Sequence, residues 1–134
     1  MTFDHLDLDD LLVVAEAVLG HAPEVRDYGL LEAALARPRA TVFGQDAYPT
    51  LELQAAALLL SLVGNHALID GNKRLGWIAC LLFLSLNGVE LRVDADADTA
   101  LVLSIANGSR SDVADVAAEL VARIVSDNRT GLGL

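Results

Sequence analysis

The stretch that decides the fold is LELQAAALLLSLVGNHALIDGNKRLGWIACLLFLSL, residues 51–86. It contains two apolar segments, 51–66 and 73–86, each of helical length. The turn LIDGN separates them, because Asp-Gly and Gly-Asn are turn dipeptides. A helix that is apolar on nearly every side belongs in a protein interior. The stretch therefore predicts a buried pair of central helices joined by a polar turn.

Four outer helices follow from apolar residues at helical spacing and from end signals. Thr50 and Ser111 are the expected N-caps of the third and sixth helices, and Pro38 ends the second at or before Arg37. The outer helices are expected at 7–19, 28–37, 96–106 and 112–125, with loops at 40–50 and 89–93 and a frayed tail at 128–134. A short extended piece is allowed within 40–50. Segment 89–93 alternates like a strand but has no evident partner, so we expect an extended loop.

Length and composition bound the class of protein. The 134 residues predict one domain, 1–134, with a single core and an all-α bundle of about six helices. The longest apolar runs, 55–60 and 77–84, are far shorter than the roughly 20 residues of a membrane-spanning helix. An acidic N-terminus without a signal peptide favours a cytoplasmic protein. The net charge of -10 argues against direct nucleic-acid binding, and the one cysteine, Cys80, excludes an internal disulfide.

The only lysine, Lys73, is followed by Arg74 where the fourth helix is expected to begin. The first turn of a helix is partially positive, so cations there cost about 0.3 to 1 kcal/mol each. That cost reverses when an anion binds, and a helix start opened by Gly71 and flanked by cations is a typical anion site. These residues predict phosphate binding.

Three other residues of the turn narrow the chemistry. His66 is suited to act as a general base near neutral pH, and Asp70 offers an oxygen ligand for magnesium. Asn72 suits phosphate binding or a helix cap. Together they suggest phosphoryl or nucleotidyl transfer from a magnesium-bound nucleotide. A plain turn with a cap, a surface cation pair and a helix-end histidine explains the same residues separately.

The stretch HALIDGNKR, residues 66–74, resembles the signature of the Fic/Doc family, His-x-Phe-x-Asp/Glu-Gly-Asn-Gly/Lys-Arg. RDYGLLEAALARPRATVFG upstream and LLFLSLNG downstream are similar to the death-on-curing (Doc) branch of that family. The resemblance covers nearly the whole chain. It implies a compact helical fold whose motif turn grips nucleotide phosphates.

The resemblance also implies a role for each matched residue. His66 would be the catalytic base, Asp70 would help to hold Mg²⁺, and Gly71, Asn72, Lys73 and Arg74 would bind the phosphates of ATP. The motif's phenylalanine is Leu68 here, which stays apolar but loses ring volume. Such volume changes typically cost about 1 kcal/mol, so the expected consequence is a looser turn.

Lys73 bears on which group is transferred. Typical Fic enzymes have glycine at this position and arginine at the position of Trp77, and they transfer AMP, whereas Doc toxins have lysine and lack that arginine. The resemblance therefore implies an ATP- and Mg-dependent protein kinase that phosphorylates a hydroxyl, a threonine in Doc toxins, on translation elongation factor Tu and halts translation. AMP transfer remains an alternative within enzymes. A catalytically weak binding module with the same fold is the alternative of a different class.

The expected partners follow from the family. Many Fic proteins carry an inhibitory helix with a glutamate followed by glycine or asparagine, and no glutamate in this chain has such a successor. Inhibition would then come from a cognate Phd-like antitoxin whose C-terminal segment folds on binding.

The remaining candidate residues have ordinary structural interpretations. His5 and His21 are expected at the surface and Arg37 and Arg39 as solvated cations, while Trp77, Cys80 and Phe83 are expected in the core, with Trp77 as an alternative wall of the nucleotide pocket. In the family, the loop of Asp46 and Tyr48 runs near the site, where it would align a target.

Overall fold

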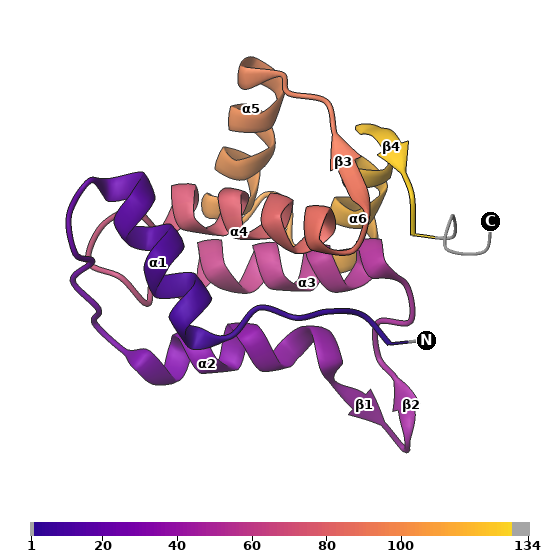
Figure 1. Ribbon diagram of the computed structural model, residues 1–134, viewed down its shortest axis with the longest axis horizontal. Coiled ribbons are helices and arrows are strands. Elements are labelled where there is room, and N and C mark those ends of the chain that lie inside the picture. The colour runs from indigo at the N-terminus through magenta and orange to yellow at the C-terminus, as the bar shows by residue number, and fades with distance from the viewer. Residues whose placement is uncertain (1, 130–134) are drawn as a thin grey trace.

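The computed structural model describes residues 2–129. Within them, helices build one core and two small two-stranded antiparallel sheets stand at its edges (Figure 1). The helices are α1 (Leu8–Leu19), α2 (Tyr28–Ala36), the 3-10 helix η1 (Arg37–Arg39), α3 (Leu51–Gly64), α4 (Asn72–Leu86), α5 (Ala95–Ala106) and α6 (Val113–Val121). The strands are β1 (Thr41–Val42), β2 (Gln45–Asp46), β3 (Val89–Leu91) and β4 (Ile124–Asp127). The expected six α-helices are present, but the two small sheets make the fold predominantly helical and not all-α as predicted.

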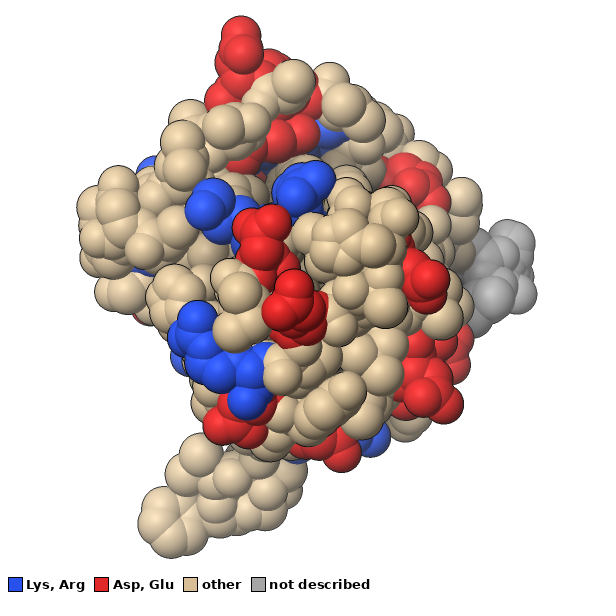
Figure 2. Space-filling model, turned by 90° about the vertical axis from the view of Figure 1, so that its left-hand side faces the viewer, with Lys and Arg blue, Asp and Glu red and all other residues tan. Residues whose placement is uncertain are grey.

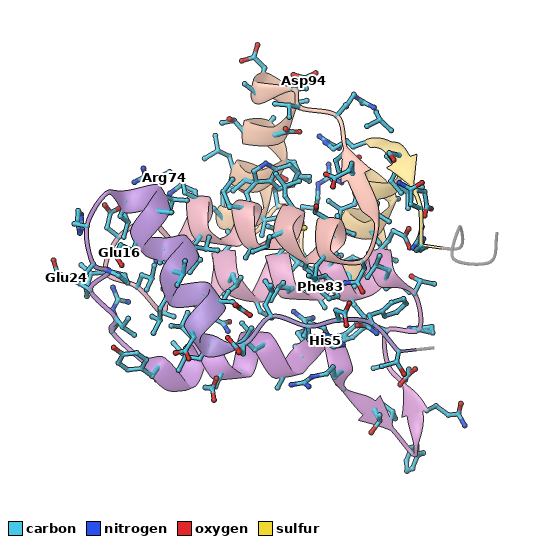
Figure 3. The ribbon with its side chains drawn as sticks, in the orientation of Figure 1. His5, Glu16, Glu24, Arg74, Phe83 and Asp94 are labelled. Carbon is cyan, nitrogen blue, oxygen red and sulfur yellow. The ribbon has the colours of Figure 1, made fainter. Side chains whose placement is uncertain are left out.

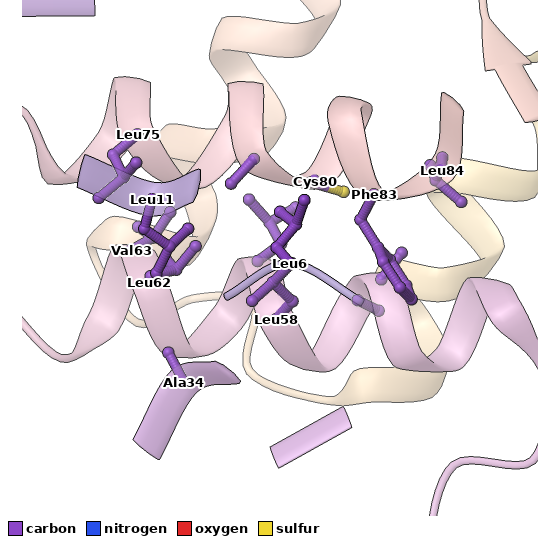
Figure 4. Packing of buried hydrophobic residues seen from close by; sticks show 14 of the residues in the cluster. Leu6, Leu11, Ala34, Leu58, Leu62, Val63, Leu75, Cys80, Phe83 and Leu84 are labelled. Carbon is purple, nitrogen blue, oxygen red and sulfur yellow. The ribbon is translucent and has the colours of Figure 1, made fainter. Parts of the chain in front are cut away.

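The central pair α3 and α4 forms the middle of the core. Eleven of the fourteen residues of α3 are buried. A Cβ on Gly76 would lie 2.7 Å from Cγ2 of Val63, so only glycine allows the two helices to approach this closely. Figure 4 shows Leu62 beside Leu11 toward one end of the pair, Leu58 and Leu6 in the middle, and Phe83 toward the other end. The rigid pair fixes both ends of the turn that joins α3 to α4.

The outer helices α1, α2 and α5 begin and end within one residue of their predicted bounds, because helix ends depend on caps that are local in the sequence. Asp7 caps α1 in a capping box with Asp10, and Gly20 ends it in the left-handed conformation at φ 81°. Thr50 accepts from the Leu53 N–H and begins α3 as expected. The N-cap of α6 is Asp112 and not Ser111.

The segment 89–93 was expected to be loop, and here the prediction was wrong. Val89–Leu91 pairs antiparallel with Ile124–Asp127, a segment that was predicted partly as the end of the sixth helix. That helix ends at Val121. Ile124 and Val125, predicted to lie in its last turn, belong to strand β4. The strand partner is distant in the sequence, so periodicity alone gave no sign of it.

The loop 40–50 contains a hairpin, β1–β2, turned at Phe43 and Gly44 with φ values of 52° and 78°. Two positive φ values in a two-residue turn match the twist of a hairpin. The predicted short extended piece is thus a pair of short strands. In the predicted tail, Arg129 pairs with Asp127 and Glu52, and residues 130–134 lie outside the described residues.

No helix within residues 2–129 combines the length and apolar character needed to cross a membrane.

Candidate functional site

The turn between α3 and α4, residues 65–71, lies at the left-hand end of the molecule in Figure 1. Asn65 caps the C-terminus of α3, and Gly71 is the N-cap of α4 at φ 94°. His66 is exposed and has a φ of 54°, a left-handed conformation in which histidine is enriched relative to most residues. The turn therefore holds the His66 side chain out of the core.

The side chain of Asn72 closes the turn on itself. Its Oδ1 accepts from the Leu68 N–H at 2.9 Å, and its Nδ2 donates to the Leu68 carbonyl at 2.9 Å. Both ends of the amide are used, so Asn72 does not cap α4 with its side chain, and Gly71 takes the cap position instead. Leu68, which stands where the motif has phenylalanine, is fully buried and so anchors the turn in the core.

A second segment, residues 24–27, braces the turn, a contact that was not predicted from the sequence. Val25 and Leu68 form an antiparallel bridge. The Arg26 N–H donates to the Ala67 carbonyl at 2.7 Å, and the Ile69 N–H donates to the Glu24 carbonyl at 2.9 Å. A single valine in a polar connection was the only sequence signal of this contact.

The family-based expectation that the loop of Asp46 and Tyr48 runs near the site was wrong for this chain. The β1–β2 hairpin lies at the end of the molecule opposite the 65–71 turn (Figure 1). The Tyr48 hydroxyl accepts from Nε of Arg37 at 3.1 Å, and the Arg37 guanidinium lies 5.7 Å from the Tyr48 ring centre. Arg37 is thus a half-buried tether of the hairpin base, whereas Arg39 is exposed as predicted.

The two cations of the motif have different surroundings. Lys73 is exposed and forms no ion pair within residues 2–129. Arg74 donates through Nη1 to the Val18 carbonyl at the end of α1, at 2.9 Å (Figure 3). On this end of the molecule Lys and Arg side chains stand beside Asp and Glu side chains without merging into one charged field (Figure 2).

Both cations line a cavity of about 580 Å³ between α4, α5 and the end of α1. Its other walls are mainly apolar and include Trp77, Ile78 and Leu103. Trp77 was expected in the core, but it is only partly buried and faces this cavity. Phe83 and Cys80 are buried as predicted.

The start of α4 has the features of an anion site. The first N–H groups of a helix have no partner within the helix, and they carry the positive end of the helix dipole. In α4 these groups belong to the residues that follow Gly71, including Lys73 and Arg74. A Cβ on Gly71 would meet Leu19 Cδ2 at 2.8 Å, so no other residue fits here without movement.

Asp70 was predicted to help hold magnesium. Its carboxylate is exposed and has no hydrogen bond or ion pair within the described residues. Those residues contain no group of three His, Cys, Asp or Glu side chains able to hold a metal ion. One free carboxylate fits Mg²⁺ only together with substrate phosphates, which is how proteins commonly bind this ion.

The other titratable candidates lie outside this site. His21 is exposed as predicted. His5 was expected at the surface but is partly buried, with its ring stacked on Phe83 at 5.4 Å between centres. Burial lowers the pKa of His5, and the nearby charge of Arg39 lowers it further. Burial raises the pKa of the Cys80 thiol to about 12, which leaves this cysteine unreactive.

Comparison with known proteins identifies the family. The model of the Fic/DOC family matches residues 5–84, which include the whole 65–71 turn and both motif cations. This chain belongs to the Fic/DOC family. The family match ends at α4, so the α5 wall of the cavity lies beyond the matched residues.

Two relatives place the chain close to Doc proteins. A protein named Toxin Doc from Mycolicibacterium smegmatis (strain ATCC 700084 / mc(2)155) is 52% identical over 118 residues, covering 87% of this chain and 91% of the relative. A protein named Protein kinase doc from Escherichia phage P1 is 32% identical over 116 residues, covering 83% of this chain and 90% of the relative. The similarity therefore extends well beyond the motif and includes most of the Fic/DOC fold described above.

Proposed function

We propose that this chain is the toxin of a toxin-antitoxin pair and acts as a protein kinase that uses ATP and Mg²⁺. The observation that carries the proposal is Lys73, an exposed cation without an ion pair in the described residues, beside the free amide end of α4. Such a residue costs stability where it stands and stabilises a bound anion. The names of the two relatives, a toxin and a protein kinase, point to the same activity.

The proposed reaction assigns one task to each residue. An imidazole nitrogen of His66 takes the proton from a hydroxyl group of the target protein. The hydroxyl oxygen then forms a bond to the γ-phosphorus of ATP, and the bond from that phosphorus to the β,γ-bridging oxygen breaks, so that ADP leaves. Lys73, Arg74 and the first amides of α4 bind the phosphates, and Asp70 supplies a carboxylate for the metal. Mg²⁺, when bound, neutralises charge on the phosphates.

Asn72 has a shaping role in this proposal, because its amide is used by the Leu68 backbone. Gly71 allows the close turn that brings the amides of α4 toward the phosphates. We propose a threonine of elongation factor Tu as the target and the cytoplasm as the place of reaction, both from the resemblance to Doc toxins.

AMP transfer is the second candidate. The presence of Lys73 and of Trp77, where typical Fic enzymes have glycine and arginine, disfavours it. A binding module without activity is the third candidate, and Leu68 in place of the motif phenylalanine is the feature that favours it. The complete burial of Leu68 argues that the smaller side chain still anchors the turn.

We propose that the cognate antitoxin occupies the cavity beside Trp77. Ile78, Leu82 and Leu86 follow one another at four-residue spacing on α4 and remain partly exposed within the described structure. They extend the apolar surface of the cavity along α4, and such a stripe fits the apolar face of an amphipathic helix. A segment in this position would lie next to Lys73 and Arg74, which also line the cavity.

The test is transfer from ATP labelled on the γ or the α phosphate to purified elongation factor Tu, with Mg²⁺ present. His66→Ala is the inactive variant, and His21→Ala is the matched control because it removes an exposed histidine that lies outside the motif sequence and whose ring bonds the Ala22 carbonyl. Transfer of the γ label by the parent and by His21→Ala, but not by His66→Ala, supports the kinase. Transfer of the α label would establish AMP transfer. Absence of transfer together with absence of ATP binding would favour the binding module.

A further inference from the structure

The last turn of α1, Val18–Gly20, touches the motif at two points. The first is a packing contact: a Cβ on Gly71 would lie 2.8 Å from Cδ2 of Leu19 and 3.3 Å from its Cγ. The Leu19 side chain therefore occupies the space that a side chain at Gly71, the N-cap of α4, would take. A movement of Leu19 would leave the backbone at this cap without support.

The second contact is the hydrogen bond from Arg74 Nη1 to the Val18 carbonyl, at 2.9 Å. The last turn of α1 contains no basic residue, and its terminal carbonyls carry a partial negative charge. Arg74 of α4 supplies the missing cation. A guanidinium has five N–H donors, so an anchor through Nη1 leaves others free for a phosphate.

The turn that makes these contacts is itself well fixed. Gly20 ends α1 in the left-handed conformation, and its N–H donates to the Glu16 carbonyl at 2.8 Å. Glu16 and Arg74 are labelled at this junction in Figure 3. Val18 also lines the 580 Å³ cavity, so the same turn of helix forms part of the cavity wall and part of the support of the motif.

We propose that Leu19 is a positioning residue for the phosphate-binding end of α4. Leu19 holds the Gly71 backbone in place, and the neighbouring Val18 carbonyl orients the Arg74 guanidinium. Leu19 itself touches no substrate. The expected effect of Leu19 on ATP binding rests on the proposed function. Its expected effect on the local stability of residues 69–75 does not, because it concerns the protein without ligand.

The experiment compares Leu19→Ala with Leu12→Ala. Leu12 is a partly buried residue of the same helix, about two turns earlier, so the control makes the same truncation away from the motif. Amide hydrogen exchange of residues 69–75 is measured without ligand, and ATP binding in the presence of Mg²⁺ is measured by calorimetry. Leu19→Met tests rescue by a side chain of similar volume.

We expect Leu19→Ala to accelerate exchange at 69–75 and to weaken ATP binding about tenfold to a hundredfold, because the loss of one hydrogen bond to a charged phosphate has an effect of this size. The change should raise KM more than it lowers kcat. Leu12→Ala should lower thermal stability but change neither the exchange rate at 69–75 nor the affinity for ATP. Leu19→Met should have the exchange rate and the ATP affinity of the parent protein. Leu19→Val is the milder truncation if the alanine variant does not fold.

Equal exchange and equal ATP affinity in Leu19→Ala and Leu12→Ala would overturn the inference. If the parent protein binds no ATP, the proposed function fails, and the exchange comparison then decides the positioning role on its own.

Discussion

The buried cation Arg123 and the exposed motif cations Lys73 and Arg74 are used in different ways. Arg123, between α6 and β4, is only 5% exposed, and it donates to Asp98 at 3.0 Å and to Glu119 at 3.1 Å. Burial alone would lower the pKa of Arg123, but hydrogen bonds and charges from these two carboxylates outweigh burial and raise it. At the motif, Lys73 is exposed and has no ion pair within residues 2–129, and Arg74 binds one backbone carbonyl.

The difference separates a charge that holds the fold together from one that has no partner within the described residues. Arg123 joins α5 to the end of α6, because its guanidinium donates to Asp98 and the Ala97 carbonyl of α5 and to Glu119 of α6. Lys73 stands at the positive end of a helix, where it lowers stability slightly. Folding therefore explains Arg123 fully and Arg74 in part, but it does not explain Lys73.

The largest expected effect is on stability at Arg123. Arg123→Ala leaves the carboxylate of Asp98 buried without its partner, so we expect the free energy of unfolding to fall by about 3 to 5 kcal/mol. Urea denaturation measures it. The control is Arg110→Ala, which removes a more exposed pair with Glu119 at 3.8 Å and should cost less than about 1 kcal/mol. Equal losses in the two variants would show that the buried ion pair of Arg123 stabilises the fold no more than an exposed pair does.

The reverse pattern is expected at Lys73. Lys73→Ala should reduce phosphate transfer about 100-fold, because it removes a donor from the developing charge, and it should leave stability unchanged or raise it by up to about 1 kcal/mol. Steady-state kinetics and urea denaturation test the two parts. Arg92→Ala, which removes an exposed cation bound to the Ala122 carbonyl, is the charge-matched control. A large loss of stability in Lys73→Ala would show that Lys73, like Arg123, stabilises the fold.

Gly71 and Gly20 offer a sharper comparison at the motif. Both have positive φ, 94° and 81°, but a Cβ meets Leu19 at Gly71 and finds no atom within 4 Å at Gly20. The left-handed conformation should cost each alanine variant about 1 to 2 kcal/mol, and Gly71→Ala should lose more because of the clash. Thermal denaturation measures both losses. Adding Leu19→Ala to Gly71→Ala should recover part of the difference, and no recovery would mean that the contact with Leu19 is not what excludes a side chain.

The smallest effect is expected at His5, which is partly buried and not ion-paired within the described residues. Its pKa is lowered by burial and by Arg39, while Asp4 opposes the shift. The unfolded chain therefore binds a proton at higher pH than the folded protein does. The free energy of unfolding therefore has its full value above about pH 6.5, where His5 is neutral in both states. It decreases as the pH falls toward the lower pKa of His5 in the folded protein.

The measurement is the difference in unfolding free energy between the parent and His5→Gln across this pH range. The parent should lose stability relative to the variant as the pH falls below about 6.5. A difference that is the same at every pH would show that His5 keeps its ordinary pKa.

The sequence was informative wherever structure depends on neighbours in the chain. The starts of α1 and α3 follow from Asp7 and Thr50, and the end of α1 follows from Gly20, because caps satisfy backbone groups only a few residues away. The motif was recognised for the same reason: its residues are consecutive. The roles assigned to them as base, metal ligand and phosphate donors remain predictions.

The sequence was uninformative wherever two distant segments meet. Nothing in 89–93 or in 122–127 indicates that the two segments pair as β3 and β4. Likewise, the bracing of the turn by residues 24–27 depends on backbone hydrogen bonds, which any non-proline residue can make.

By itself, then, the sequence determined the helices, the buried central pair and the position of the motif between them. Only the tertiary structure decided that Arg74 is anchored on Val18, 56 residues away, that Leu19 supports Gly71, and that Trp77 lines a cavity. Local spacing specifies which face of a helix is apolar. Which helix then covers that face, and at what distance, is settled by the packing of the whole core.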